Sequence, residues 1–201
     1  MDITTVAQLE ELYGQVLPTS LAKEVDRLTP EYRAMIAASP FFALATCGPG
    51  GLDCSPRGDA AGFVEVLDEA TLLIPDRRGN NRLDSLHNIL ADPRVALLFL
   101  IPGIGHTLRV NGTARLVRDD ALAARFAVRE KAPTLVVVVT VQSVYFQCPK
   151  ALVRSDLWNP EKFRAPSDVP TAGAIMAGIA EGFDGKAYDD AYPERLRTTL
   201  Y

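Results

Sequence analysis

The spacing of hydrophobic residues changes twice along the chain. In the first forty residues apolar positions recur at intervals of three and four, as at Val6, Leu9 and Leu12, which predicts helices. Short runs rich in β-branched and aromatic residues follow, with turn residues between them, and this is typical of strands joined by hairpins. Near the end the helical spacing returns. The predicted divisions are a helical segment (1–40), a β-rich domain (41–164) and a helical tail (165–201).

Two of the expected strands are almost continuously apolar. The runs RVALLFLI (94–101) and LVVVVTVQSV (135–144) predict strands that are covered on both faces. Further strands are expected at 41–47, 52–55, 62–67, 71–75 and 107–117, the last with a bulge at Gly112. Short helices are expected at 19–28, 80–91 and 119–128. Six or seven strands at hairpin spacing predict a closed antiparallel barrel, mainly β with flanking helices (α+β), rather than a parallel sheet.

Composition narrows the class of protein. With 48% hydrophobic and 23% charged residues, the chain has the balance of a folded globular protein. Its net charge of -4 argues against nucleic-acid binding, which requires a basic face. We expect no membrane span and no secretory leader, because no long apolar run is present. The three cysteines form no CxxC pair, which favours a reducing cytoplasm and no structural metal or disulfide framework.

The densest polar cluster is PDRRGNNR, at residues 75–82, between an expected strand and an expected helix. Free N–H groups at a helix start, together with guanidinium groups, favour phosphate. A solvated basic loop is the alternative interpretation. We favour a phosphate site, because asparagines stand at the expected helix start in a chain that is acidic overall. The candidates are Arg77, Asn80, Asn81 and Arg82.

A second polar motif, SPRGD at residues 55–59, interrupts a hairpin. Proline and glycine inside a strand indicate an edge, a bulge or the close approach of another group to the backbone. Ser55, Arg57 and Asp59 are therefore binding candidates. Alternatively, Arg57 and Asp59 form a surface ion pair with each other.

Three cations and the sole tryptophan follow or interrupt the later strands. In CPKALVRSDLW (148–158), Lys150 and Arg154 stand near Trp158. This segment is either a binding surface or a helix cap with a packed indole. Arg109, in an alternating strand, either binds a ligand or faces water.

Nothing in the sequence forms a catalytic constellation. The two histidines are far apart, and Ser55 lacks the GxSxG context of a hydrolase nucleophile. The catalytic residues therefore stay unassigned, as does any metal ligand.

Taken in order, the motifs resemble one known family. SPRGD, IPDRRGNNRLDSLHNILADPRVALLFLIPG, TLRVNG and CPKALVRSDLW are similar to the pyridoxamine 5'-phosphate oxidase-like flavoproteins, and within them to an uncharacterised bacterial subfamily. The resemblance covers residues 41–158. It implies an antiparallel split β-barrel of the FMN-binding type, and a homodimer with FMN at the subunit interface.

The resemblance also implies roles for the candidate residues. Asn81 and Arg82 stand where the family holds the FMN phosphate, with Arg77, Arg78 and Asn80 sharing that role. The strand of Ser55, Arg57 and Asp59 corresponds to the one that lies along the flavin ring. The segment of Lys150, Arg154 and Trp158 corresponds to the region that reaches the flavin from the partner subunit.

The sequence departs from the oxidases at two places. The interval between Arg82 and Pro93 is longer than usual, and the tail PERLRTTLY does not match the oxidases' substrate-binding segment. We therefore expect an FMN-dependent oxidoreductase with an unknown small-molecule substrate. The alternatives are a flavin- or haem-binding module without turnover, and a deazaflavin-dependent reductase. The tail either packs on its own barrel or covers the flavin cleft.

Overall fold

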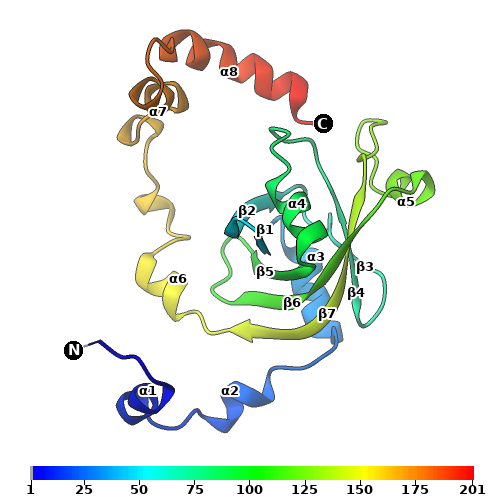
Figure 1. Ribbon diagram of the computed structural model, residues 1–201, viewed down its shortest axis with the longest axis vertical. Helices are drawn as coiled ribbons and strands as arrows, with labels where there is room; N and C mark the ends of the chain where they lie inside the picture. The colour runs from blue at the N-terminus through cyan, green and yellow to red at the C-terminus, as the bar shows by residue number, and fades with distance from the viewer. Residues whose placement is uncertain (1) are drawn as a thin grey trace.

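The computed structural model describes residues 2–201 and centres on one curved antiparallel sheet (Figure 1). Its seven strands are hydrogen-bonded in the order β2-β1-β5-β6-β7-β4-β3. Their bounds are β1 Phe41–Gly48, β2 Gly51–Gly58, β3 Glu65–Val66, β4 Thr71–Pro75, β5 Arg94–Leu100, β6 Thr107–Val117 and β7 Val136–Gln147. The fold is a split β-barrel, mainly β with flanking helices.

The expectation of a closed barrel is wrong for the described chain. Strands β2 and β3 stand at the two ends of the strand order, each with a single strand partner. Strand β3 is only two residues long, too short to pair along β2. The sheet curls, but no main-chain hydrogen bonds join its two edge strands, β2 and β3, so the barrel stays open between them.

The helices lie before, between and after the strands. They are α1 Val6–Tyr13, α2 Pro18–Ala22, α3 Pro30–Ala38, α4 Asp84–Ala91, α5 Asp120–Ala124, α6 Lys150–Ser155, α7 Ala172–Ile179 and α8 Gly185–Thr199, with short 3₁₀ turns at Pro160–Lys162 and Pro166–Asp168. Helix α2 ends six residues before the predicted end at Leu28. Val25 instead forms an extended bridge to Val144 of β7, and a residue paired in this way cannot continue a helix.

Gly112 allows the long β6–β7 ladder to bend. The pairing register shifts between Asn111 and Gly112, as expected of a bulge. A Cβ at Gly112 would lie 2.1 Å from the carbonyl oxygen of Thr140, so only glycine fits. This bend lets one ladder join β5 on one side to β4 on the other.

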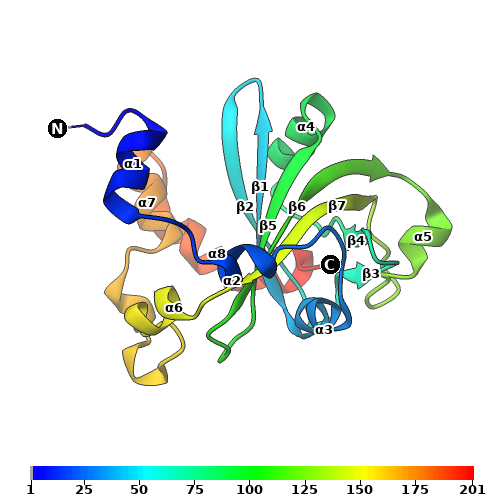
Figure 2. The same cartoon turned by 90° about the horizontal axis from the view of Figure 1, so that it is seen from below.

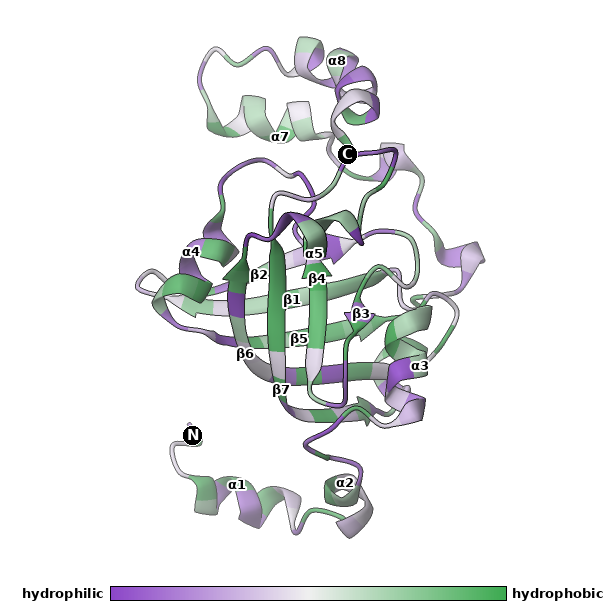
Figure 3. Cartoon of the chain, turned by 90° about the vertical axis from the view of Figure 1, so that its right-hand side faces the viewer, coloured by the Kyte–Doolittle hydropathy of each residue, from purple (hydrophilic) through white to green (hydrophobic). Residues whose placement is uncertain are grey.

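The main hydrophobic core fills the inside of the curved sheet, where strands β4 and β7 stand out as apolar in Figure 3. Helix α3 contributes the fully buried Ile36, and α4 contributes Leu86 and Ile89. A second cluster around Phe126 covers the other face of β4 and β7. The start of β7 is therefore buried on both faces, as predicted.

Strand β5 departs from that prediction. Its residues alternate between buried and half-exposed, so one face is only partly covered within a single chain. The half-exposed positions Ala96 and Leu98 pair with Ala45 and Ala43 of β1, and these two alanines are also only partly buried. An apolar, partly exposed face therefore runs across β1 and β5.

The terminal helices extend away from the sheet, α1 and α2 at one end and α6 to α8 along one side (Figures 1 and 2). They carry many exposed apolar side chains, including Leu12 and Ile179. Helices α7 and α8 pack on each other, and the chain breaks between them as predicted. Of residues 2–201, no helical stretch has the length and hydrophobicity needed to cross a bilayer.

Candidate functional site

A large cleft opens where β2 approaches the loop between β4 and α4. Its volume is about 1250 Å³, compared with roughly 300–1,000 Å³ for typical small-molecule sites. The walls come from β2, from the loop of residues 75–86, from the lead into β7 at residues 131–135, and from Phe63 and Tyr201. Six predicted site residues line it: Ser55, Arg57, Arg77, Asn80, Asn81 and Arg82.

Two crossed ion pairs hold the cleft together. Arg57 Nη1 lies 2.9 Å from Asp76 Oδ1, and Arg77 Nε lies 2.6 Å from Asp59 Oδ2. The surface pair between Arg57 and Asp59, considered from the sequence, is not the arrangement found. Each arginine instead pairs with the acid of the other motif, which joins the end of β2 to the end of β4.

Arg57 also carries an unsatisfied donor. Its Nε is buried and has no hydrogen-bond partner among residues 2–201, although the residue lines the cleft. A buried donor without an acceptor costs about 1–3 kcal/mol. A ligand that supplies an acceptor at this wall would remove that cost, which fits a polar cofactor in the cleft.

Arg77 is fully engaged by the protein. Besides Asp59, its Nη1 donates to the carbonyl oxygen of Phe126 at 2.7 Å, and its guanidinium lies 5.6 Å from the ring centre of Tyr201. Its side chain is 18% exposed. These contacts give Arg77 an anchoring role and leave little of it free for an anion.

The other two arginines of the loop are more available. Arg78 lines the cleft and is exposed, and among residues 2–201 its side chain makes no hydrogen bond or ion pair. Arg82 is exposed and donates to Asp84 Oδ2 at 2.7 Å. This hydrogen bond and the charge of Asp84 raise the pKa of Arg82 above its usual value, so the guanidinium stays charged.

The loop before α4 is strained. Asn81 and Leu83 have φ values of 59° and 61°, in the left-handed region that residues other than glycine and asparagine rarely adopt, so the strain lies at Leu83. Helix α4 consequently begins at Asp84 rather than at the predicted Asn80. Asp84 and Ser85, in its first turn, line the cleft, so the positive end of the helix dipole faces it. Such strain is frequent at binding sites.

Tyr201 forms a wall of the cleft that the sequence pattern did not indicate. Its hydroxyl donates to Asp59 Oδ1 at 2.7 Å, and Lys131 Nζ donates to its main-chain oxygen at 2.8 Å. Burial of Asp59 opposes ionisation, but hydrogen bonds from Tyr201, Ala60 and Arg77 outweigh it, so the pKa of Asp59 lies below its usual value. The bond to Asp59 raises the pKa of Tyr201.

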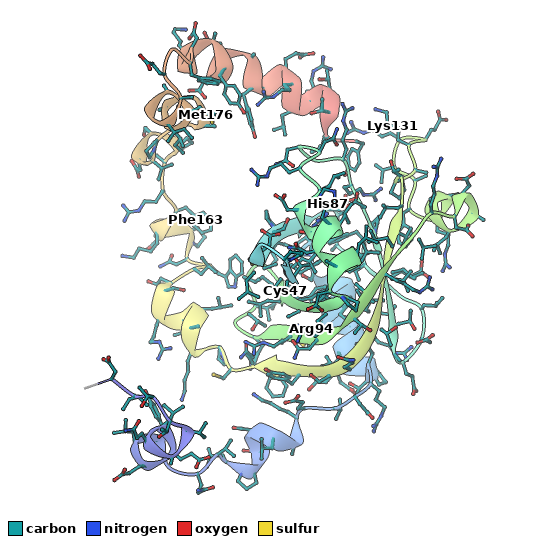
Figure 4. The ribbon with its side chains drawn as sticks, in the orientation of Figure 1. Cys47, His87, Arg94, Lys131, Phe163 and Met176 are labelled. Atoms are coloured by element: carbon teal, nitrogen blue, oxygen red, sulfur yellow. The ribbon has the colours of Figure 1, made fainter. Side chains whose placement is uncertain are left out.

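The remaining candidates lie outside the cleft of a single chain. Arg109 on β6 donates to Tyr145 Oη at 2.7 Å. Trp158 donates through Nε1 to the carbonyl oxygen of Ile104 at 2.9 Å, while Lys150 and Arg154 of α6 are exposed. Figure 4 places the segment after α6, marked by Phe163, on the opposite side from Lys131 at the cleft.

The comparison of sequences decides the family. The sequence model described as pyridoxamine 5'-phosphate oxidase matches residues 28–148, more than half of the chain and the whole curved sheet. The chain belongs to this family. No curated protein matches it.

Three solved structures show partial similarity to this chain. A single-residue variant of HupZ from Group A Streptococcus is 17% identical, covering 60% of this chain and 99% of its own, with a TM-score of 0.49. A protein assigned provisionally as a pyridoxamine 5'-phosphate oxidase, from Lactobacillus delbrueckii, is 24% identical over 60% and 95% of the two chains, with a TM-score of 0.46. An FMN-binding protein from Syntrophomonas wolfei is 13% identical over 57% and 82%, with a TM-score of 0.45.

Proposed function

We propose that the chain binds FMN in this cleft and acts as an oxidoreductase on a small molecule that stays unidentified. Family membership supports the cofactor class. The observation that carries the proposal is the buried, unpartnered Nε of Arg57 beside an arginine-rich loop. A flavin offers carbonyl and hydroxyl acceptors at one end and a phosphate at the other, which matches these two features of the cleft.

The charges of the cleft favour an anion at the arginine loop. The Arg57–Asp76 and Arg77–Asp59 pairs are each neutral, and Asp84 offsets Arg82. Arg78 and Lys131 supply positive charge beyond these pairs, and Asp53, which also lines the cleft, offsets one of them, so one positive charge remains. We assign the phosphate to Arg78, Arg82 and the free N–H groups at the start of α4, because charge-assisted hydrogen bonds to phosphate are strong.

Arg57 and Ser55 are assigned to the flavin ring or the ribityl chain. Both stand on β2, and the Arg57–Asp76 pair fixes the guanidinium in place. Bound FMN would supply the redox chemistry, and the protein supplies position and electrostatics. The residues of this chain then orient the ring and exclude water from one side of it.

We also propose a homodimer with FMN at the interface. The partly exposed apolar face of β1 and β5 and the exposed apolar side chains of the terminal helices support this arrangement, since contiguous exposed apolar surface marks interaction sites. A second copy would cover these surfaces. It would also bring residues absent from the single-chain cleft, such as Arg109 or Trp158, toward the flavin.

Identifying the ligand released by heat tests this function. Mass spectrometry of the supernatant from native protein should show FMN. Release of haem or of a deazaflavin would contradict the FMN proposal and support one of the alternatives. Consumption of a reduced nicotinamide by the loaded protein in steady state would distinguish an enzyme from a binding module.

A further inference from the structure

Tyr201 connects the helical tail to the cleft. Among the described residues of the tail (165–201), it alone lines the cleft. The hydrogen bonds found between the tail and the rest of the described chain are the two made by Tyr201, to Asp59 and from Lys131. Helices α7 and α8 are instead tied to each other, as by the bond from the Gly173 amide to Asp189 Oδ1 at 2.8 Å.

The contacts of Tyr201 converge from three separate segments. Asp59 follows β2, Arg77 follows β4, and Arg129 and Lys131 precede β7. The tyrosine ring lies 5.6 Å from the guanidinium carbon of Arg77 and 5.7 Å from that of Arg129, within the range of cation–π attraction. A single side chain thus joins three walls of the cleft at one end.

Tyr201 bounds one end of the cleft without filling it. The volume of about 1250 Å³ remains with the tyrosine in place, which is larger than most small-molecule sites require. It lies against Arg77, the anchored arginine, rather than against the more available Arg78 and Arg82. Tyr201 therefore lies where it would border a bound ligand, and it does not occupy the anion site.

We propose that Tyr201 is a positioning residue that closes one end of the FMN cleft and slows release of the flavin, with α7 and α8 acting as the strap that delivers it. This inference rests on the proposed FMN function. The hydrogen bond from the hydroxyl to Asp59 and the ring contacts with two arginines both hold the Tyr201 side chain in place. Loss of the whole side chain should therefore matter more than loss of the hydroxyl alone.

Release of FMN from the loaded protein tests the proposal directly. The appearance of free flavin fluorescence gives the release rate for wild type, Tyr201→Ala, Tyr201→Phe and Tyr192→Ala. Tyr192 is the matched control, because it stands on α8 with its ring against Tyr188 and Arg195. We expect Tyr201→Ala to release FMN about tenfold faster, corresponding to about 1.4 kcal/mol. Tyr201→Phe should fall between it and wild type, and Tyr192→Ala should match wild type.

Two results would overturn the proposed role of Tyr201. Equal FMN release rates in Tyr201→Ala and Tyr192→Ala would show that Tyr201 does not affect the flavin. Slower release in Tyr201→Ala would show that Tyr201 competes with FMN for the cleft. Failure of wild type to bind FMN would instead refute the proposed function. Hydrogen exchange of the ligand-free variants separates these cases: the loops 76–83 and 129–135 should exchange faster in Tyr201→Ala than in Tyr192→Ala. Equal exchange would show that Tyr201 does not close the cleft at all.

Discussion

Arg57 and Asp76 join two strands that share no main-chain ladder. Arg57 stands on β2 and Asp76 directly follows β4, strands that lie toward opposite ends of the sheet order. Their side chains meet at 2.9 Å because the sheet curls, and the Arg77–Asp59 pair makes the same connection in reverse. The ion pairs therefore close the barrel on the side where backbone hydrogen bonds do not, and the candidate site lies at this closure.

Breaking the Arg57–Asp76 pair should destabilise the fold. Both side chains are less than a quarter exposed, so Asp76→Ala leaves a largely desolvated cation, at a cost of about 1–3 kcal/mol. The double variant Arg57→Ala/Asp76→Ala should lose less free energy of unfolding than the two single variants together, because removing one partner alone leaves the other charge unpaired. Free energies of unfolding from urea titration measure this coupling. Strict additivity would show that the pair contributes nothing, and Arg27→Ala, from an exposed pair, is the control.

The arginines of the loop should divide into two kinds. Arg77→Ala should lower the melting temperature, because it removes the partner of the nearly buried Asp59. Arg78→Ala and Arg82→Ala should keep the melting temperature and weaken FMN binding, each by about tenfold or more, as expected for charged hydrogen bonds. Equilibrium titration with FMN, beside thermal unfolding, separates the two effects. His87→Ala, an exposed position on α4 outside the cleft, should change neither the melting temperature nor the FMN affinity. Full FMN affinity in both Arg78→Ala and Arg82→Ala would show that the phosphate binds elsewhere.

The sequence indicated the arginine loop, but it did not indicate which arginine anchors the fold and which are available to a phosphate. Arg77 and Arg78 are adjacent and identical in type, and their difference comes from Asp59, 18 residues from Arg77. Only the strand order brings that carboxylate near. A signal was nevertheless present: SPRGD and PDRR carry complementary charges, which would favour pairing between the motifs.

Other features of the site depend on tertiary contacts that no local pattern encodes. The strands and the bulge at Gly112 could be predicted, because burial alternates with a fixed period and glycine marks the irregular position. The left-handed Leu83 could not, since leucine ordinarily favours a helix. Tyr201 follows the polar helix α8, and nothing in that segment indicates that its ring meets Arg77 and Arg129. The cover of β5 could not be predicted either, because an apolar run does not specify whether the residues that cover it come from the same chain.

Gly112→Ala should test the bend in the β6–β7 ladder. The added methyl would overlap the carbonyl of Thr140 at 2.1 Å, and backbone must move, so we expect a loss of roughly 2 kcal/mol or more in the free energy of unfolding. Gly178→Ala is the control, because a Cβ there meets nothing within 4 Å and alanine favours a helix. Equal stability of the two variants would show that the bulge tolerates a side chain.

The lowered pKa of Asp59, caused by hydrogen bonds that outweigh its burial, predicts a dependence of stability on pH. A carboxylate whose folded pKa lies below its unfolded value stabilises the fold fully above the unfolded value, and this contribution is lost as pH falls through the folded value. The melting temperatures of wild type and Asp59→Asn should therefore differ most at neutral pH. The gap should narrow below the ordinary aspartate value of 3.8. A constant gap between pH 6 and pH 3 would contradict the assignment.

The apolar face of β1 and β5 should determine the oligomeric state. Leu98 pairs with Ala43 on that face and is only partly buried in the single chain, so an arginine there places a charge in the proposed interface. Light scattering should give a dimer for wild type and a monomer for Leu98→Arg, and the monomer should hold FMN more weakly because it lacks the partner's residues. Leu52→Arg, at the start of β2 beside the β1–β2 turn and with Leu52 88% exposed, should remain dimeric. Thermal unfolding checks that Leu98→Arg is folded. A wild-type monomer that retains FMN tightly would mean that one chain supplies the whole site, and the residues on α6 would then have no role toward the flavin.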